Sequence, residues 1–284
     1  MSAIFYPTIV VAVIGLIAGL GLAIASIVMA VPVNKKEQDV LDALPGANCG
    51  SCGFSGCSGY AAALAKGEAD TNLCSPGGAD TAKKIASILG VSGGEFVKKA
   101  AVVKCLGNCD NTRTKYEYRG EKSCAAAIQL EGGPMECPYG CMGFGDCVAA
   151  CEYNAIKVCN GVASVDPSSC TGCGKCVKAC PKGIIELATV SEKNFVTVLC
   201  SNRDKGAQTR KQCGIGCIGC MKCVKACESG AISVNNFLAS IDASKCTGCE
   251  KCVKVCVQGC IESLKSYVFD APETDGEDEQ PFTF

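Results

Sequence analysis

The chain has 284 residues, room for about two or three modest domains. Twenty-seven of them are cysteine, and histidine and tryptophan are both absent. Without histidine, the chain cannot form a Ser-His-Asp triad, a His-ligated zinc enzyme, a Rieske centre or a His-ligated haem. The formal net charge of −1 lacks the basic surplus that is typical of nucleic-acid-binding proteins.

The first predicted element is an apolar N-terminal segment. No charged residue precedes Lys35, and the run from about Pro7 to Val33 is almost wholly apolar. That run exceeds the ~20 residues that a bilayer-spanning helix requires. Gly15 and Gly19 form a GxxxG pair, which allows close packing against a neighbouring helix. The sequence therefore predicts a single transmembrane anchor over 1–33.

A cleaved signal peptide is the alternative interpretation, because Val28-Met29-Ala30 resembles a cleavage site. Signal peptides begin with a positive region, however, and residues 1–10 carry no charged side chain. The Lys35-Lys36 pair follows the apolar run, so the positive-inside rule predicts a cell (inner) membrane protein with its bulk in the cytoplasm. Thiols stay reduced in the cytoplasm, which favours metal ligands over disulfides. The odd number of cysteines also prevents complete pairing.

Behind the anchor, cysteine spacing divides the chain into domains. We predict a first cysteine domain over 34–100, two repeated cysteine modules over 101–190 and 191–265, and an acidic tail over 266–284. The cysteine-free stretch 79–101 is predicted to be helical, since Ala82, Ile85 and their apolar neighbours recur at helical spacing. Gly90 is the expected stop of that helix.

The two modules are an internal duplication with an offset of 76 residues. The sequence CTGCGKCVKAC beginning at Cys170 recurs as CTGCEKCVKVC beginning at Cys246. Upstream, the four cysteines from Cys137 to Cys151 recur between Cys213 and Cys227. Each unit also has a Val-rich lead-in that ends in a cysteine, Cys105 in the first and Cys200 in the second.

The spacing within these modules is that of bacterial ferredoxins. In a C-x2-C-x2-C-x3-C run, the first three thiolates bind one [4Fe–4S] cluster and the fourth binds its partner cluster. Three runs, beginning at Cys170, Cys217 and Cys246, have this spacing. In a fourth run Phe144 replaces the second cysteine, so one ligand must come from elsewhere. Cys137 is nearest in sequence. The alternatives are Cys105, Cys124 or a cube that lacks one iron.

Crossed ligation predicts four clusters in the two modules, and the first cysteine domain predicts one more. The predicted ligand sets are Cys137, Cys141, Cys147 and Cys180; Cys151, Cys170, Cys173 and Cys176; Cys217, Cys220, Cys223 and Cys256; Cys227, Cys246, Cys249 and Cys252; and Cys49, Cys52, Cys57 and Cys74. Two CxxC pairs also suit a zinc site or a disulfide framework, but three repeats of the ferredoxin run favour [4Fe–4S] clusters.

Seven cysteines remain outside these sets: Cys105, Cys109, Cys124, Cys159, Cys200, Cys213 and Cys260. One interpretation makes them buried small side chains or spare thiols. The other draws a sixth cluster from Cys105, Cys109 and Cys124, with Cys137 as a further candidate. The repeat argues against this sixth cluster, because Cys109 has no counterpart in the second unit. The prediction is at least five clusters, with a sixth left open.

The expected fold class is α+β. It comprises a transmembrane helix, a small iron–sulfur domain and two tandem ferredoxin-like modules of βαβ type with short strands and Cys-rich loops. No convincing nucleotide-binding motif, paired acid/base carboxylates or nucleophile motif is present, so no catalytic residue is predicted. A chain with several clusters and no substrate site is best interpreted as an electron carrier. Metal supplies most of the energy that orders such loops, so the apo chain should be largely unfolded.

The segment ALPGANCGSCGFSGCSGYA, placed behind an apolar helix and followed by Cys74 and ferredoxin runs, resembles the B subunit of the Rnf complex. The resemblance covers nearly the whole chain. The duplicated modules depart from the short form of the family, which has one pair, and resemble the elongated form of anaerobes. This resemblance implies a translocase component that takes electrons from reduced ferredoxin for NAD+ reduction, coupled to Na+ or H+ export. Other membrane and flavin- or NAD-binding subunits would be its partners.

From chain order alone, the cluster of the first cysteine domain is expected to be the exit towards the membrane partners. A membrane-bound redox sensor is one alternative function, although a sensor needs one labile cluster and an output domain. The other alternative is an electron-transfer subunit of a different ferredoxin-linked membrane enzyme, such as a hydrogenase. Co-purifying flavin-bearing subunits, as opposed to a nickel or molybdenum subunit, would separate these possibilities.

Overall fold

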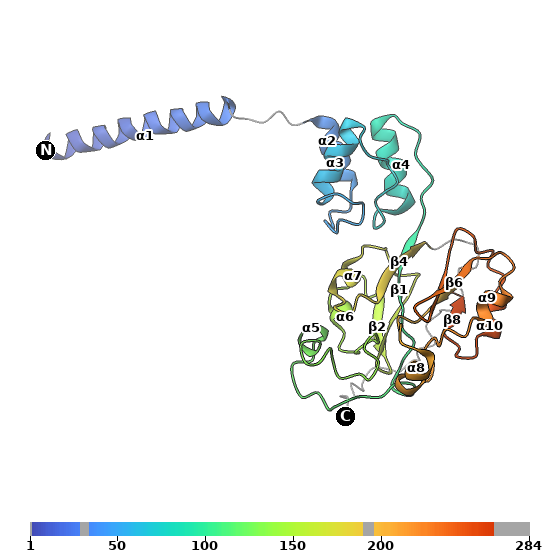
Figure 1. Cartoon of the computed structure of the whole chain (residues 1–284). Coiled ribbons are helices and arrows are strands. Elements are labelled where there is room, and N and C mark those ends of the chain that lie inside the picture. Colours follow the sequence, from blue (N-terminus) through green and yellow to red (C-terminus); the bar gives the residue numbers. More distant parts are fainter. Residues whose placement is uncertain (1, 29–33, 190–195, 264–284) are drawn as a thin grey trace, which may run out of the picture.

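The computed structural model describes residues 2–28, 34–189 and 196–263. The predicted acidic tail over 266–284 lies outside these residues. The described elements form a helical N-terminal part followed by two small modules of strands and short helices (Figure 1). The expected α+β class is therefore present in the described part of the chain.

The N-terminal helix α1 spans Ser2–Val28, within the segment predicted to be helical. Its described side chains between residues 9 and 25 are exposed, and it stands apart from the other helices in Figure 1. Across the three described ranges, no helix combines the length and apolar character needed to cross a membrane. The predicted transmembrane anchor is therefore not confirmed.

Three helices build the first cysteine domain. They are α2 (Lys35–Ala43), α3 (Cys57–Lys66) and α4 (Gly78–Leu89). Val40, Tyr60 and Ile85, one from each helix, are at most 1% exposed and form the centre of its core. The predicted helix stop at Gly90 is confirmed, because this residue caps α4 with a left-handed φ of 68° that glycine adopts without strain.

The first module consists of two strand pairs and three short helices. Its elements are β1 (Lys99–Val103), α5 (Cys124–Ala127), α6 (Asp146–Ala149), β2 (Ile156–Cys159), β3 (Val162–Val165), α7 (Lys175–Ala179) and β4 (Ile185–Thr189). β1 pairs with β4, and β2 forms a hairpin with β3. Both pairs are antiparallel, and short helices lie between β1 and β2 and between β3 and β4, so each half of the module is a strand–helix–strand unit, in agreement with the expected type of module. β4, the last strand of the module, runs antiparallel to β1, the first strand. The short helices lie at the cysteine loops.

The second module repeats this plan. Its elements are β5 (Val196–Val198), α8 (Gly206–Gln212), α9 (Lys222–Ala226), β6 (Ile232–Asn235), β7 (Leu238–Ile241), α10 (Lys251–Val255) and β8 (Ile261–Ser263). β5 pairs with β8 and β6 with β7, again antiparallel. Even the surface ion pairs recur, since Lys175 binds Glu152 and Lys251 binds Glu228. The structure thus confirms the duplication.

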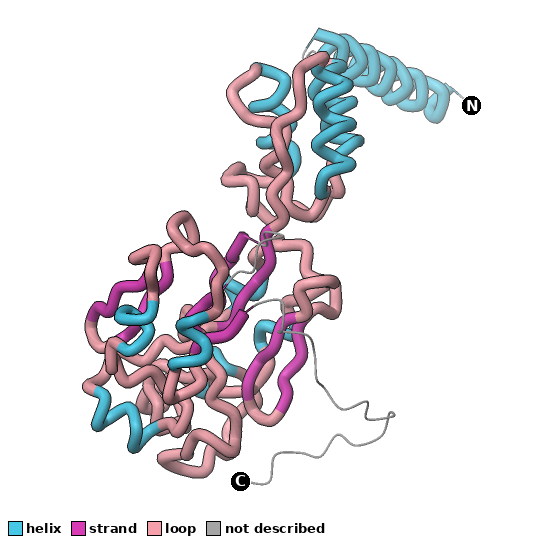
Figure 2. Tube along the Cα trace, turned by 90° about the vertical axis from the view of Figure 1, so that its right-hand side faces the viewer, coloured by secondary structure: helices cyan, strands magenta, loops and turns pink. Residues whose placement is uncertain are grey.

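The two modules lie side by side in both views (Figures 1 and 2). Leu199, 1% exposed, packs against Val102 of β1 and Ala188 of β4. Polar contacts support this packing: Lys104 Nζ donates to Thr197 Oγ1 at 3.1 Å, and Ser201 Oγ donates to the Lys104 carbonyl at 2.9 Å. The modules therefore share an interface at the start of each repeat.

Candidate functional site

Four cavities in the two modules are each bordered by four or more cysteines. Their volumes are about 390, 350, 330 and 310 Å³. No three Cys, Asp or Glu side chains in the described ranges come close enough together to hold a single metal ion. The thiols are arranged around these larger spaces, and thiolates are the protein ligands that [4Fe–4S] clusters use.

One cavity of the first module brings together a predicted ligand set. Cys151, Cys170, Cys173 and Cys176 all border the space of about 310 Å³. The backbone N–H of Ala101 in β1 donates to Cys170 Sγ at 3.3 Å, which ties this loop to the sheet. The geometry agrees with crossed ligation, because Cys151 comes from the other cysteine run of the module.

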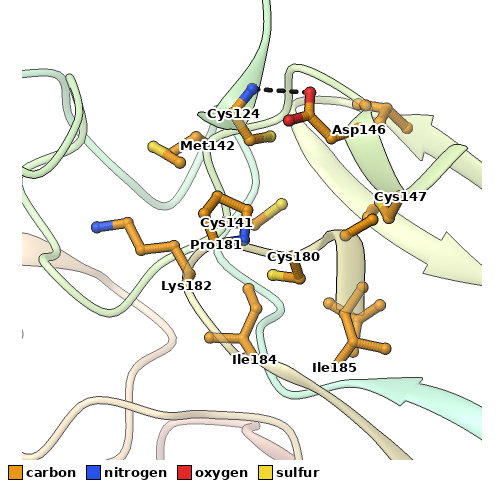
Figure 3. Close-up of a pocket in the computed structure, with 15 residues that line it drawn as sticks. Cys124, Cys141, Met142, Asp146, Cys147, Cys180, Pro181, Lys182, Ile184 and Ile185 are labelled. Carbon is orange, nitrogen blue, oxygen red and sulfur yellow. Dashed lines mark hydrogen bonds between the residues drawn. The ribbon is translucent and has the colours of Figure 1, made fainter. Parts of the chain in front are cut away.

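The other cavity of the first module differs from the prediction. Cys141, Cys147 and Cys180 border it as expected, but the fourth cysteine is Cys124 and not Cys137 (Figure 3). Cys137 borders a separate cavity. The structure thus groups Cys124, one of the stated alternatives, with these three cysteines, and places Cys137 at another cavity.

Cys124 reaches this cavity because an inserted segment folds onto the neighbouring helix. Ser123 caps the one-turn helix α5. The Asp146 carboxylate at the start of α6 accepts a hydrogen bond from the Cys124 N–H at 2.8 Å (Figure 3) and another from the Ala125 N–H at 2.9 Å. Cys147 follows Asp146 directly in sequence. The Asp146 carboxylate thus fixes the position of Cys124 relative to Cys147.

The residue that interrupts the run also helps to hold this insertion. The rings of Phe144 and Tyr118 are tilted, with centroids 5.4 Å apart. Both pack with Cys124 and Met142 in one small apolar cluster. Phe144 thus stands where the second repeat has Cys220, and its contact with Tyr118 helps to dock the segment that carries Cys124. The uncharged Cys-Ala-Ala-Ala turn after Ser123 was the sequence signal for this role, and it was too weak to select Cys124.

The second module groups its predicted sets in a similar way. Cys217, Cys220, Cys223 and Cys256 border the cavity of about 350 Å³, as predicted, together with the leftover Cys260. Cys260 is 1% exposed, and its sulfur lies 3.7 Å from that of Cys256. Its counterpart in the first repeat is Ile184, so a buried small side chain accounts for it.

The last predicted set of this module is grouped less completely. The neighbouring Cys246 and Cys249 thiols contribute, after burial, to raising the pKa of Cys252, so these three lie close together. Cys227 follows α9, which packs against α10. Cys227 and Cys246 both pack against the core of this module. Ligation by Cys227 stays a prediction.

In the N-terminal domain, the four predicted cysteines lie near one another. Burial raises the pKa of Cys74, and the nearby Cys57, Cys49 and Cys52 thiols raise it further. Asn48 Oδ1 accepts a hydrogen bond from the Cys57 N–H at 2.9 Å, which closes the loop at the start of α3. Gly50 and Gly53 have φ of 72° and 89°, conformations that side chains other than glycine rarely adopt.

The protonation of these thiols also fits a metal-binding role. Burial, together with a smaller contribution from the neighbouring cysteines, raises the pKa of Cys147 to about 12 and that of Cys176 to about 11. Crowded thiols of this kind stay protonated unless a positive centre compensates their charge. An iron–sulfur core provides that compensation, because its ligands are thiolates. The donor set and the spaces it surrounds therefore fit [4Fe–4S] clusters.

Two cysteine loops from different domains are in direct contact. Ser51 Oγ, between Cys49 and Cys52, donates to the Gly172 carbonyl at 2.9 Å. Lys178 Nζ donates to the Cys49 carbonyl at 3.0 Å. Because Gly172 lies within the Cys170–Cys176 loop, the N-terminal site and that site of the first module are neighbours.

Three protein-family models match the cysteine-rich segments. A putative Fe-S cluster family matches residues 44–76, a 4Fe-4S binding domain matches 163–186, and a 4Fe-4S dicluster domain matches 216–260. These matches agree with the cysteine grouping in the structure. The chain therefore carries multiple [4Fe–4S] clusters.

Similar proteins cover most of the chain. The B subunit of the Na+-translocating ferredoxin:NAD+ oxidoreductase complex of Acetobacterium woodii is 45% identical over 94% of this chain and 80% of its own length. The B subunit of the proton-translocating ferredoxin:NAD+ oxidoreductase complex of Clostridium ljungdahlii is 45% identical over 86% of each chain. The B subunit of the ion-translocating oxidoreductase complex of Methanosarcina acetivorans is 43% identical over 86% of this chain and 93% of its own. With such identity over most of both chains, the protein belongs to the family of B subunits of ion-translocating oxidoreductase complexes.

Proposed function

We propose that this chain is the electron-transfer subunit of a membrane-bound ferredoxin:NAD+ oxidoreductase. It accepts electrons from reduced ferredoxin and relays them towards NAD+ reduction, coupled to export of Na+ or H+. When bound, each [4Fe–4S] cluster accepts and releases one electron. The names of the relatives include both a sodium- and a proton-translocating complex, so the proposal covers either ion.

The observation that carries this proposal is the contact between cysteine loops of separate domains. Ser51 and Lys178 fasten the Cys49 loop to the Cys170–Cys176 loop. Within the first module, the Cys176 thiol is close enough to Cys147 to contribute to its raised pKa, so the two sites of this module are also neighbours. An electron relay needs an uninterrupted series of neighbouring cysteine sites. An isolated structural metal site does not need such neighbours.

The second module is the proposed entry for electrons. Of the predicted ligand cysteines, all within the described residues, Cys220 and Cys249 are the two that are exposed. Both belong to the second module, whereas the N-terminal domain contacts the first. A soluble ferredoxin docking near Cys220 or Cys249 would come closest to a ligand sulfur. The N-terminal site, at the other end of this series, is then the exit.

The membrane anchor is part of this proposal. Leu16, Leu20 and Leu22 of α1 are 61–73% exposed, and large apolar side chains gathered on one helix mark a surface that another apolar phase covers. Lys35 and Lys36 at the start of α2 would keep the remaining domains on the cytoplasmic side. The exit site would then lie in the domain next to the membrane.

Replacing Cys52 by serine tests the exit. We expect Cys52→Ser in the purified complex to leave the module clusters reducible by ferredoxin, because their ligands are untouched. NAD+ reduction should fall by at least about 10-fold, since even second-shell changes at metal sites cost about 10–100-fold. Stopped-flow absorbance of the clusters and NADH formation are the two measurements.

Cys109→Ser is the matched control, because this exposed thiol borders none of the four cavities. It should leave both rates unchanged. Full-rate NADH formation by Cys52→Ser would show that the N-terminal site is not the exit. Unreduced module clusters in the unsubstituted complex would refute the electron-transfer function itself.

A further inference from the structure

We propose that Cys105, Cys137, Cys200 and Cys213 bind a sixth [4Fe–4S] cluster, at the interface between the two modules. These four cysteines border the cavity of about 330 Å³. Two come from each repeat, and three of them belong to no ligand set predicted from spacing. The proposal rests on the proposed function only in taking the bound group to be an iron–sulfur cluster.

The four cysteines are related by the internal repeat. Cys137 and Cys213 are separated by its 76-residue offset, and Cys105 and Cys200 each end the lead-in of their unit. The hydrogen bonds follow the same symmetry: the Cys141 N–H donates to Cys105 Sγ at 3.4 Å, and the Cys217 N–H donates to Cys200 Sγ at 3.3 Å. Equivalent residues of the duplicated units thus face one shared space.

The space is enclosed in the way a ligand cradle requires. All four cysteines are at most 8% exposed. Gly107 borders the same space: a Cβ added there would lie 2.7 Å from Thr112 Cγ2 and in van der Waals contact with Cys213 Sγ at 3.4 Å and Cys105 Sγ at 3.5 Å, so a larger residue would crowd this wall. The volume lies between those of the cavities bordered by the ferredoxin-type sets, about 310 and 350 Å³. Buried thiols crowded without a positive partner are costly unless they are protonated or bound to metal.

Asn202 borders the polar side of the cavity and is held there by Gln212. Asn202, 1% exposed, donates from Nδ2 to Cys137 Sγ at 3.4 Å and to Gln212 Oε1 at 2.8 Å. Its Oδ1 accepts from the Asp204 N–H at 2.7 Å, which fixes the amide orientation. An N–H donor aimed at a ligand sulfur stabilises the more negative, reduced state of an iron–sulfur cluster and raises its potential.

The position of this site gives it a role in the relay. Cys141 borders a first-module cavity and Cys217 borders a second-module cavity. The N–H groups of these residues donate to Cys105 and Cys200, so the interface site touches a neighbouring site in each module. A cluster here would connect the sites of the two modules into one continuous series. This series would run from the sites of the exposed Cys220 and Cys249 to the N-terminal domain.

The test uses the full chain purified without oxygen, with Cys200→Ala and Cys213→Ala combined. Neither residue belongs to another proposed set. We expect about 24 iron atoms per unsubstituted chain and about 20 in the double variant, each with an equal amount of acid-labile sulfide. The reduced double variant should also lose electron paramagnetic resonance intensity equivalent to one cluster. Cys109→Ala combined with Cys159→Ala, which removes two thiols outside all four cavities, should keep about 24.

Equal iron content in the Cys200/Cys213 variant and the unsubstituted chain would overturn the proposal. About 20 iron atoms per chain in both the unsubstituted protein and the double variant would also overturn the proposal, but would not contradict the electron-transfer function. Little iron in every protein would refute the proposed function instead. If the double variant does not fold, the Asn202→Leu variant provides the test instead, because this variant keeps every thiol. We expect unchanged iron and a more negative potential for one cluster, and unchanged potentials throughout would contradict the site.

Discussion

Substitution of Cys124 by alanine is expected to disable the first module. Cys124 borders the cavity shared by Cys141, Cys147 and Cys180, so its loss leaves that cluster with three thiolates. We expect iron to fall by at least about one atom per chain, since the unliganded corner of the cube is released first. Electron delivery from ferredoxin to NAD+ in the complex should fall by at least about 10-fold. Iron analysis and NADH formation measure the two effects.

Cys159→Ala is the control for this substitution. Cys159 ends β2 in the same module, is half-buried and borders none of the four cavities. It should retain full iron and full activity. If Cys124→Ala kept the iron content and activity of Cys159→Ala, the fourth ligand of this site would have to come from another residue, and the assignment of Cys124 would be refuted.

Removal of iron and sulfide is expected to unfold both modules. Their strands are three to five residues long and their helices four to seven, and cysteines make up much of each core. Elements of this size cannot offset the entropy of ordering their loops, whereas structural metal sites contribute on the order of 10 kcal/mol. We expect hydrogen-exchange protection in β1 to β8 to disappear after chelation without oxygen.

The N-terminal domain provides an internal comparison in that experiment. Its helices α2, α3 and α4 are nine to twelve residues long and share an apolar core around Tyr60. This core should retain partial protection in α3 and α4, while the Cys49–Cys57 loop loses it. Full protection of β1 and β4 in the iron-free chain would show that the modules fold without metal.

The predicted cysteine sets that the structure groups around one cavity are mostly those whose members are close together in the chain. The Cys170–Cys176 and Cys217–Cys223 loops each wrap one space, and the partners Cys151 and Cys256 follow from the ferredoxin pattern. Local spacing carries this information because a few turning residues determine where the sulfurs lie. The helix ending at Gly90 was predictable for the same reason.

The cysteine groupings that spacing did not predict depend on tertiary packing. Cys124 reaches its cavity through the capping of α5 by Asp146 and the contact between Tyr118 and Phe144, neither of which sequence separation reveals. Cys137 was assigned by proximity along the chain, yet the structure places it with Cys213, its counterpart in the repeat. Strand direction was not predicted, because cysteine spacing does not distinguish antiparallel pairs from a parallel crossover.

The most direct test of the account is reduction of the full chain by reduced ferredoxin. The chain would be purified without oxygen and mixed with reduced ferredoxin in a stopped-flow instrument, with cluster absorbance recorded during transfer and electron paramagnetic resonance spectra taken afterwards. We expect bleaching of the cluster absorbance and signals from several reduced [4Fe–4S] clusters, one electron for each. Unchanged absorbance in an iron-loaded chain, or zinc in place of iron, would contradict it.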